Sequence, residues 1–231
     1  MRILFIAADK MEYAGVLQNS TNVRPPRLPI HWARQGRLGP HEALLAANGA
    51  GAARAAAAVD AACVHFHPEA VVSTGFCGAL DPSLTVASIV VATTVSTPGP
   101  SYPALPVLSD SPFCAGPVAS IGHVARTAEE KRSLRAAGAC AVEMEAAGVA
   151  AQASERGLPF YCIRAVTDLA GETLQNDFNK ALRPDGHFDT IFILASALRY
   201  PVIRLPELVR LRSRCLSASR ALGSFLANCR F

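Results

Sequence analysis

Apolar segments of strand length alternate with longer helix-like segments along most of the chain, and this alternation limits the fold more than any other feature. Buried parallel strands read as nearly continuous apolar runs, whereas helices need longer segments and often contain many alanines. The predicted strands are 2–8, 41–48, 69–74, 86–94, 118–121 and 158–166, and the predicted helices lie within 48–66, 127–137, 143–156 and 172–198. The pattern predicts a three-layer α/β/α fold with a central mixed, mostly parallel sheet.

The length fits one large domain or two small ones, and because no linker or repeat divides the chain a single α/β domain is predicted over residues 1–200. Of the 231 residues 51% are hydrophobic and 17% are charged, which provides enough apolar material for a sizeable core. No apolar run reaches the roughly 18 residues needed to span a bilayer, and charge interrupts the first ten residues too early for a secretion signal. Seven scattered cysteines without metal-ligand spacing favour a reduced, cytoplasmic protein with no metal site.

Positive charge is concentrated at the C-terminal end of the chain. Residues 199–231 contain seven Arg and one Glu, for +6, so the other 198 residues sum to −2 within a total of +4. Leucines near helical spacing predict a basic amphipathic helical arm over residues 201–231. Such an arm can lie on an anionic membrane surface, and a helix packed on its own domain or on a second subunit fits the same pattern.

Acidic residues occur where predicted strands end or helices begin. Glu12 follows the first strand, and Asp168 ends the last one. Glu143 and Glu145 stand at the start of the predicted helix 143–156, where positions two apart point in different directions and cannot serve the same neighbour. Each acid alone fits a helix cap or first turn. Because ligands bind at the strand ends of open α/β sheets, several acids there fit acid–base cleavage of a glycosidic bond.

Several of these segments resemble the nucleoside phosphorylase/nucleosidase superfamily, in particular its methylthioadenosine/S-adenosylhomocysteine nucleosidase branch. The resemblance is strongest in VEMEAA, PF and RAVTD, within residues 141–168, and extends to RILFIAADKME at 2–12 and STGFCGALDPSLTVASIVVAT at 73–93. The C-terminal part, with FNKALRPDG at 178–186 and the basic arm, is similar to the hopanoid-associated members that act as adenosylhopane nucleosidases.

The resemblance implies a role for each matched residue. Asp168 would protonate the purine at N7, with Thr167 orienting it, and its carboxyl would be kept protonated by burial or by a second carboxylate. Glu12 would activate the attacking water, while Glu145 would hold the ribose hydroxyls. The remaining matched positions belong to the substrate pocket: Met144 against the sugar, Glu143 at the pocket edge, Gly75 and Phe76 in the glycine-rich loop, and Val124 near adenine through its backbone.

The sequence also bears on the choice between hydrolysis and phosphorolysis. Phosphorylases of the superfamily have an RVGS-like stretch whose Arg and Ser help to bind phosphate, whereas Ser73 and Phe76 stand at these positions here. Loss of a cationic ligand disfavours phosphate, so water is the expected nucleophile. A phosphorylase, a methylthioadenosine/S-adenosylhomocysteine nucleosidase and a non-catalytic nucleoside-binding protein are the alternatives, and the intact acids argue against the last.

The resemblance also implies the partners of the chain. A small-molecule nucleoside, lipid-linked in the hopanoid-associated members, would be the substrate, with no organic cofactor and no nucleic acid. A homodimer is expected from the nucleosidase branch, and peripheral contact with the inner membrane is expected through the arm.

Other candidate motifs in the sequence do not indicate a site of their own. GAGAAR at 49–54 lacks the spacing of a dinucleotide loop and is interpreted as a sheet-to-helix turn. His65 and His67 lack a third metal ligand, and Cys77 is interpreted as a small buried side chain.

Overall fold

A computed structural model describes all residues 1–231 and contains one continuous mixed sheet. Strands β4, β1, β5 and β10 are parallel to one another, and β6, β8 and β9 form a second parallel set, joined to the first by antiparallel pairing. Antiparallel β2, β3 and β7 extend the edges. The strands are β1 (Arg2–Ala7), β2 (Ser20–Arg24), β3 (Trp32–Leu38), β4 (His41–Ala47), β5 (Ala70–Ala79), β6 (Ile89–Ser96), β7 (Ser101–Pro103), β8 (Cys114–Ser120), β9 (Ala141–Glu143) and β10 (Phe160–Asp168).

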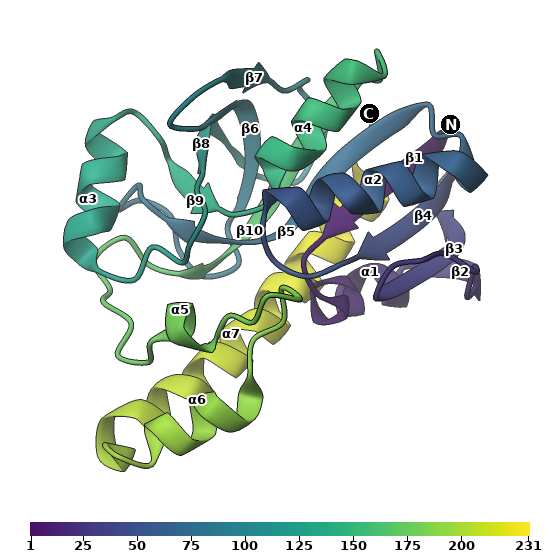
Figure 1. Cartoon of the computed structure of the whole chain (residues 1–231). Helices are drawn as coiled ribbons and strands as arrows, with labels where there is room; N and C mark the ends of the chain where they lie inside the picture. The colour runs from purple at the N-terminus through teal and green to yellow at the C-terminus, as the bar shows by residue number, and fades with distance from the viewer.

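Helices cover both faces of the sheet, which confirms the predicted three-layer α/β/α fold (Figure 1). On one face, α2 and α4 bury alanines and valines against β1 and β5. On the other, α1 and the second half of α7 bury Val16, Leu222 and Phe225 against Phe5 and Ile163. The helices are the 3₁₀ helix η1 (Lys10–Tyr13), α1 (Ala14–Gln18), α2 (Ala52–Phe66), α3 (Ala128–Ala136), α4 (Ala146–Glu155), α5 (Phe178–Ala181), α6 (Thr190–Ala197) and α7 (Pro201–Asn228).

Two predicted boundaries near the site are wrong. Strand β5 does not end at Thr74 but continues to Ala79, since GFCGA pairs with β10 and β9. The segment from Glu143 is not a helix from its first residue, because Glu143 ends strand β9 and the helix begins at Ala146. Short apolar runs fit a buried strand and a buried helix equally well, and here pairing with β8 and β5 selects the strand.

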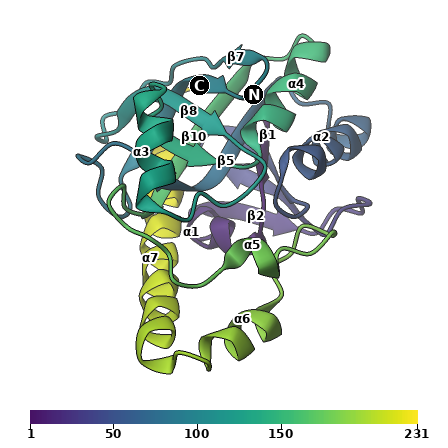
Figure 2. The same ribbon diagram turned by 60° about the vertical axis from the view of Figure 1, so that its left-hand side comes forward.

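Helix α7 has two halves with different surroundings. Its second half lies in the core, with Ala218, Leu222, Phe225 and Leu226 buried. Its first half pairs with α6 in a helical hairpin that extends away from the sheet (Figures 1 and 2). The predicted helix over residues 201–231 is present as α7, and packing on its own domain describes its second half, while contact of the arm with a membrane stays a prediction. None of the helices combines the length and the apolar character that spanning a membrane requires.

A tight backbone contact fixes the second half of α7. A Cβ atom on Gly223 would lie 2.1 Å from the carbonyl carbon of Gly15 in α1. We predict that Gly223→Ala lowers the free energy of unfolding by about 1–3 kcal/mol through overpacking, measured by urea denaturation. Ser224→Ala, at an exposed neighbouring position of the same helix, should leave the stability within about 0.5 kcal/mol of the wild type. Equal stabilities for the two variants would contradict this packing.

Candidate active site

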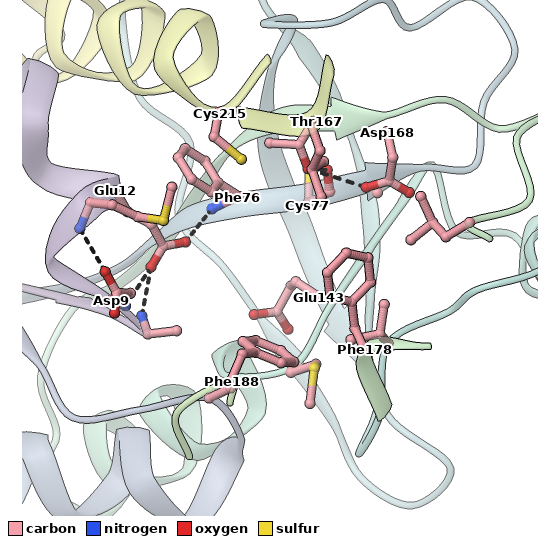
Figure 3. A pocket seen from close by; sticks show the side chains of 18 of the residues that line it. Asp9, Glu12, Phe76, Cys77, Glu143, Thr167, Asp168, Phe178, Phe188 and Cys215 are labelled. Carbon is pink, nitrogen blue, oxygen red and sulfur yellow. Dashed lines mark hydrogen bonds between the residues drawn. The ribbon is translucent and has the colours of Figure 1, made fainter. Parts of the chain in front are cut away.

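A cavity of about 570 Å³ gathers most of the predicted site residues at one end of the sheet. Its lining includes Glu12, Phe76, Val124, Glu143, Met144, Glu145, Thr167 and Asp168. Figure 3 shows Glu12 and Asp168 at opposite sides of this cavity. Gly75 is the one predicted residue outside the lining. A Cβ there would lie 2.4 Å from Oε1 of Glu12, so Gly75 makes room for this carboxylate and its φ of +123° suits glycine.

Glu12 is held by three backbone donors. The N–H groups of Ala8 and Asp9 donate to its Oε2 at 2.8 Å each, and the N–H of Phe76 donates to Oε1 at 2.7 Å. The carboxyl is therefore fixed at the entry to η1, where Asp9 caps the turn. Burial raises the pKa of Glu12, and the backbone hydrogen bonds oppose that shift. A buried, oriented carboxylate of this kind is suited to accept a proton from water.

Glu143 and Glu145 meet at one buried cation, Arg164, which corrects the expectation that two acids two residues apart cannot serve one neighbour. Arg164 is fully buried in β10, and one of its Nη atoms contacts Glu143 while the other lies 3.3 Å from Oε2 of Glu145. Because Glu143 ends a strand and Glu145 immediately precedes the next helix, the intervening chain turns both carboxylates toward Arg164. Arg164 also donates to Oγ of Ser73 at 2.6 Å.

The two acids have different surroundings at the helix start. Glu143 Oε2 accepts the N–H groups of Glu145 and Ala146 at 2.9 and 2.8 Å, so it caps α4 as well as pairing with Arg164. Glu145 accepts only the N–H of Gly51, at 3.1 Å, besides Arg164. Burial raises the pKa of Glu145 to about 7, although Arg164 lowers it. Of the pair, Glu145 makes the fewer hydrogen bonds, while Oε1 of Glu143 is buried without a hydrogen-bond partner, and both residues line the cavity.

Asp168 stands beside a buried lysine. Its Oδ2 contacts Nζ of Lys131, which comes from α3, and Thr167 Oγ1 lies 3.1 Å from its Oδ1. Burial or a second carboxylate was expected to keep this carboxyl protonated, but the neighbour that the structure places there is a cation. Neither Lys131 nor Arg164 was predicted from the sequence. Each is a buried cation whose acidic partner comes from another element of the fold.

The groups expected near adenine are already hydrogen-bonded. The N–H of Val124 donates to Oδ1 of Asn179 at 2.8 Å, and Nδ2 of Asn179 donates to the Val124 carbonyl at 3.0 Å. His123 contacts Glu130 of α3 at 2.5 Å. Reading of a base by the backbone of Val124 would therefore require the Asn179 side chain to move.

The remaining wall of the cavity is largely apolar. It comes from the segment 174–215 and includes Leu174, Phe178, Phe188, Ile193, Leu208, Leu211 and Cys215. Cys77 also lines the cavity, but burial raises the pKa of its thiol well above the usual value, so this thiol is not poised as a nucleophile. No group of three or more His, Cys, Asp or Glu side chains could hold a metal ion.

The family model of the Phosphorylase superfamily matches residues 2–121 and 109–184 of the chain, which include most of the residues that line the cavity. The chain therefore belongs to the phosphorylase superfamily. This chain is 30% identical over 178 residues to the 5'-methylthioadenosine/S-adenosylhomocysteine nucleosidase of Geobacillus kaustophilus, covering 64% of this chain and 76% of that protein. It is 32% identical over 177 residues to the nucleosidase of the same name from Geobacillus thermodenitrificans, covering 64% and 75%. The expectation of an N-glycosyl hydrolase agrees with these relatives.

Solved structures support the same fold. The Neisseria meningitidis 5'-methylthioadenosine/S-adenosylhomocysteine nucleosidase, in complex with methylthio-immucillin-A, aligns with a TM-score of 0.75 at 20% identity over 98% of this chain and 96% of its own. The futalosine hydrolase of Helicobacter pylori aligns with a TM-score of 0.71 at 17% identity over 98% and 95%. At these identities the similarity shows the fold alone.

The raised pKa of Glu145 predicts a pH dependence of stability. With a value of about 7 in the folded state against 4.5 ordinarily, the folded protein keeps a proton that the unfolded chain loses. The free energy of unfolding should therefore fall, by about 1–3 kcal/mol, as pH rises from about 4.5 to 7. Urea denaturation across this range should show a smaller fall for Glu145→Gln than for the wild type and for the exposed control Glu155→Gln. A fall of the same size in all three proteins would contradict this.

Proposed function

We propose that the protein hydrolyses the N-ribosidic bond of a 5′-substituted adenosine and releases adenine. The observation that carries this proposal is that Glu12, Glu145 and Asp168, from separate parts of the chain, line one cavity. Breaking this bond builds positive charge on the ribose and negative charge on the departing base. Carboxylates around the sugar and a proton donor at the base are therefore the groups that the transition state requires.

Each acid takes one part of the reaction. Asp168 delivers the proton to purine N7, and Thr167 restrains its carboxyl through Oδ1. Glu12 holds the attacking water and takes its proton, with an orientation set by three backbone N–H groups. Glu145 binds the ribose hydroxyls, Met144 packs against the sugar, and Glu143 holds Arg164 and the start of α4. General acid assistance of this type is worth about 10²–10⁴ in rate.

Water suits this site better than phosphate. The backbone N–H of Phe76, which could bind an anion, already donates to Glu12 at 2.7 Å. Arg164, the cation nearest to the two glutamates, is fully buried and engaged with Ser73, Glu143 and Glu145. A phosphate dianion beside Phe76 would therefore meet the carboxylate of Glu12 and find Arg164 already engaged. Arg212, an exposed residue of α7, is the guanidinium in the cavity lining. Phosphorolysis stays the alternative, and it predicts that turnover depends on phosphate.

Adenine release provides the direct test of the proposed reaction. We predict that the wild type releases adenine from methylthioadenosine, S-adenosylhomocysteine or adenosylhopane in phosphate-free buffer. Asp168→Asn should lose at least about 10²-fold in rate, because the amide cannot supply the proton. The exposed Asp60→Asn serves as the control and should keep full activity. Strict dependence on phosphate, or full activity of Asp168→Asn, would contradict the proposed reaction.

We further propose that the 5′ group is large and apolar, as in adenosylhopane. The support is the cavity wall formed by Phe188, Ile193, Leu208 and Leu211, which the helical hairpin and the segment just before it supply. A small 5′ group, as in methylthioadenosine, would leave much of this wall without contact. The alternative is a methylthioadenosine/S-adenosylhomocysteine nucleosidase, and the ratio of kcat/KM values for the three substrates separates the two.

The outer surface of the hairpin supports peripheral contact with a membrane. Leu198, Tyr200, Val202 and Ile203 are exposed at its turn, Val202 by 86%, and Arg199 lies among them. Exposed apolar side chains next to arginines fit an anionic bilayer surface. Such contact would bring the apolar wall of the cavity close to a membrane-resident substrate. A cytoplasmic location and a homodimer stay predictions, and analytical ultracentrifugation tests the dimer.

Substitutions at the hairpin turn test the membrane proposal without disturbing the core. Truncation before α7 would remove Leu222 and Phe225 from the core, so point variants are preferable. We predict that Val202→Asp with Ile203→Asp lowers binding to vesicles of anionic phospholipid at least about tenfold, because the acids repel the surface and cannot insert. Val64→Asp, at a 67% exposed position on α2, should bind like the wild type. Equal sedimentation of all three proteins with vesicles would refute membrane contact.

A further inference from the structure

Lys131 is a fully buried lysine on a helix whose other charged side chains reach the surface. Its side chain has no exposed area, whereas its neighbours Glu129 and Arg132 are partly or fully exposed. Inside the protein, Nζ contacts Oδ2 of Asp168 and donates to the carbonyl of Leu169 at 2.8 Å. Burying an ammonium group costs several kcal/mol unless it is paired, and its single charged partner is the acid that the reaction uses.

This pairing raises a problem for the proposed reaction. Nζ of Lys131 and Oδ2 of Asp168 form an ion pair, and a carboxylate has no proton of its own to give to the purine. Thr167 is the other side chain that contacts the carboxyl, and a hydroxyl group is too weakly acidic to replace the missing proton. Lys131 is the group in direct contact with Asp168 that carries a transferable proton.

The other ionisable groups that face Asp168 do not supply this proton. Burial raises the pKa of the thiols of Cys77 in β5 and Cys215 in α7, so both stay neutral and weakly acidic. Arg214 of α7 is held by Glu172 through two hydrogen bonds of 2.7 and 2.9 Å, and a guanidinium does not release its proton in proteins. Lys131 and Asp168 are therefore the two groups that can supply a proton to the departing base.

We propose that Lys131 and Asp168 hold the catalytic proton jointly and that Lys131 is its source. As the C1′–N9 bond breaks, its electron pair passes to the purine. One Nζ–H bond of Lys131 breaks, and the proton passes through Oδ2 of Asp168 to N7. Adenine leaves neutral, Lys131 is left as an amine, and Asp168 is again a carboxylate.

The cycle closes without another reagent. Water gives a hydroxyl group to C1′ and its other proton to Glu12. After adenine departs, Glu12 releases this proton to solvent and Lys131 takes one up, so both groups return to their starting states. Lys131 acts through Asp168, so it is a positioning residue for the general acid rather than a group that touches substrate. This inference rests on the proposed nucleosidase reaction.

Two substitutions separate a proton source from an ion-pair anchor. Lys131→Arg keeps the charge and a hydrogen bond to Asp168 but cannot give up a proton. Lys131→Met removes the charge, so Asp168 alone must gain and lose the proton. An anchor would be rescued by arginine, whereas a proton source would not.

The experiment measures kcat/KM for adenine release between pH 5 and 9.5, with methylthioadenosine and adenosylhopane as substrates. We expect Lys131→Arg to lose at least about 10²-fold at every pH. We expect kcat/KM of Lys131→Met to fall most at alkaline pH and far less at pH 5. The reason is that the alkaline limb of its pH profile should move to lower pH by more than about one unit. Arg132→Met, exposed on the same helix, is the matched control and should follow the wild-type profile.

Three outcomes would overturn the inference. Lys131→Arg with at least half of the wild-type activity would show an anchor, and so would an equal loss for Lys131→Met at every pH. Thermal unfolding of each variant identifies losses of activity that come from misfolding. If one variant does not fold, the other still distinguishes a proton source from an anchor. A wild type that releases no adenine from any of the adenosines would refute the proposed function itself, and this inference with it.

Discussion

The buried guanidinium of Arg164 is the interaction on which the site depends. It lies inside β10 with no exposed area and connects three elements, through Ser73 of β5, Glu143 at the end of β9 and Glu145 at the start of α4. One buried cation contacts both carboxyl groups but balances a single negative charge, which agrees with the raised pKa of Glu145, and removal of the cation would leave both acids buried without a charged partner. The arrangement also fixes where Glu145 points, because its carboxylate is held between Arg164 and the backbone of Gly51.

One side of the cavity belongs to the layers of the sheet, and the other is formed by helices that project from them. Its catalytic side is built from strand ends and tight turns, and Gly75 lies opposite Arg164 in the β5–β10 register, where a larger residue would collide with Glu12. Its other side comes from α5, α6 and the first half of α7, outside the layers of the sheet. In the proposed reaction, chemistry at the sugar and recognition of the 5′ group would therefore rest on different parts of the fold.

The sequence predicted the parts of the site that depend on local pattern. Glu12 and Asp168 could be found because each follows a long apolar strand, and the three-layer fold follows from the alternation of strands and helices. The directions in which the Glu143 and Glu145 side chains point could not be predicted. Glu143 belongs to a strand because β9 pairs with β5 and β8, and the local sequence does not reveal this pairing. Lys131 and Arg164 were missed for a related reason. A buried charge is identified by its partner. Asp168 lies 37 residues from Lys131, and Glu143 and Glu145 lie 21 and 19 residues from Arg164, so no local pattern joins them.

A crystal structure of Asp168→Asn with methylthioadenosine bound would show whether the three acids surround one nucleoside, since this variant should hold the nucleoside intact. We expect N7 within hydrogen-bond distance of residue 168, the ribose hydroxyls on Glu145, and a water on Glu12 facing C1′. A nucleoside bound with its base next to Glu12, or outside the cavity that the three acids line, would contradict this expectation.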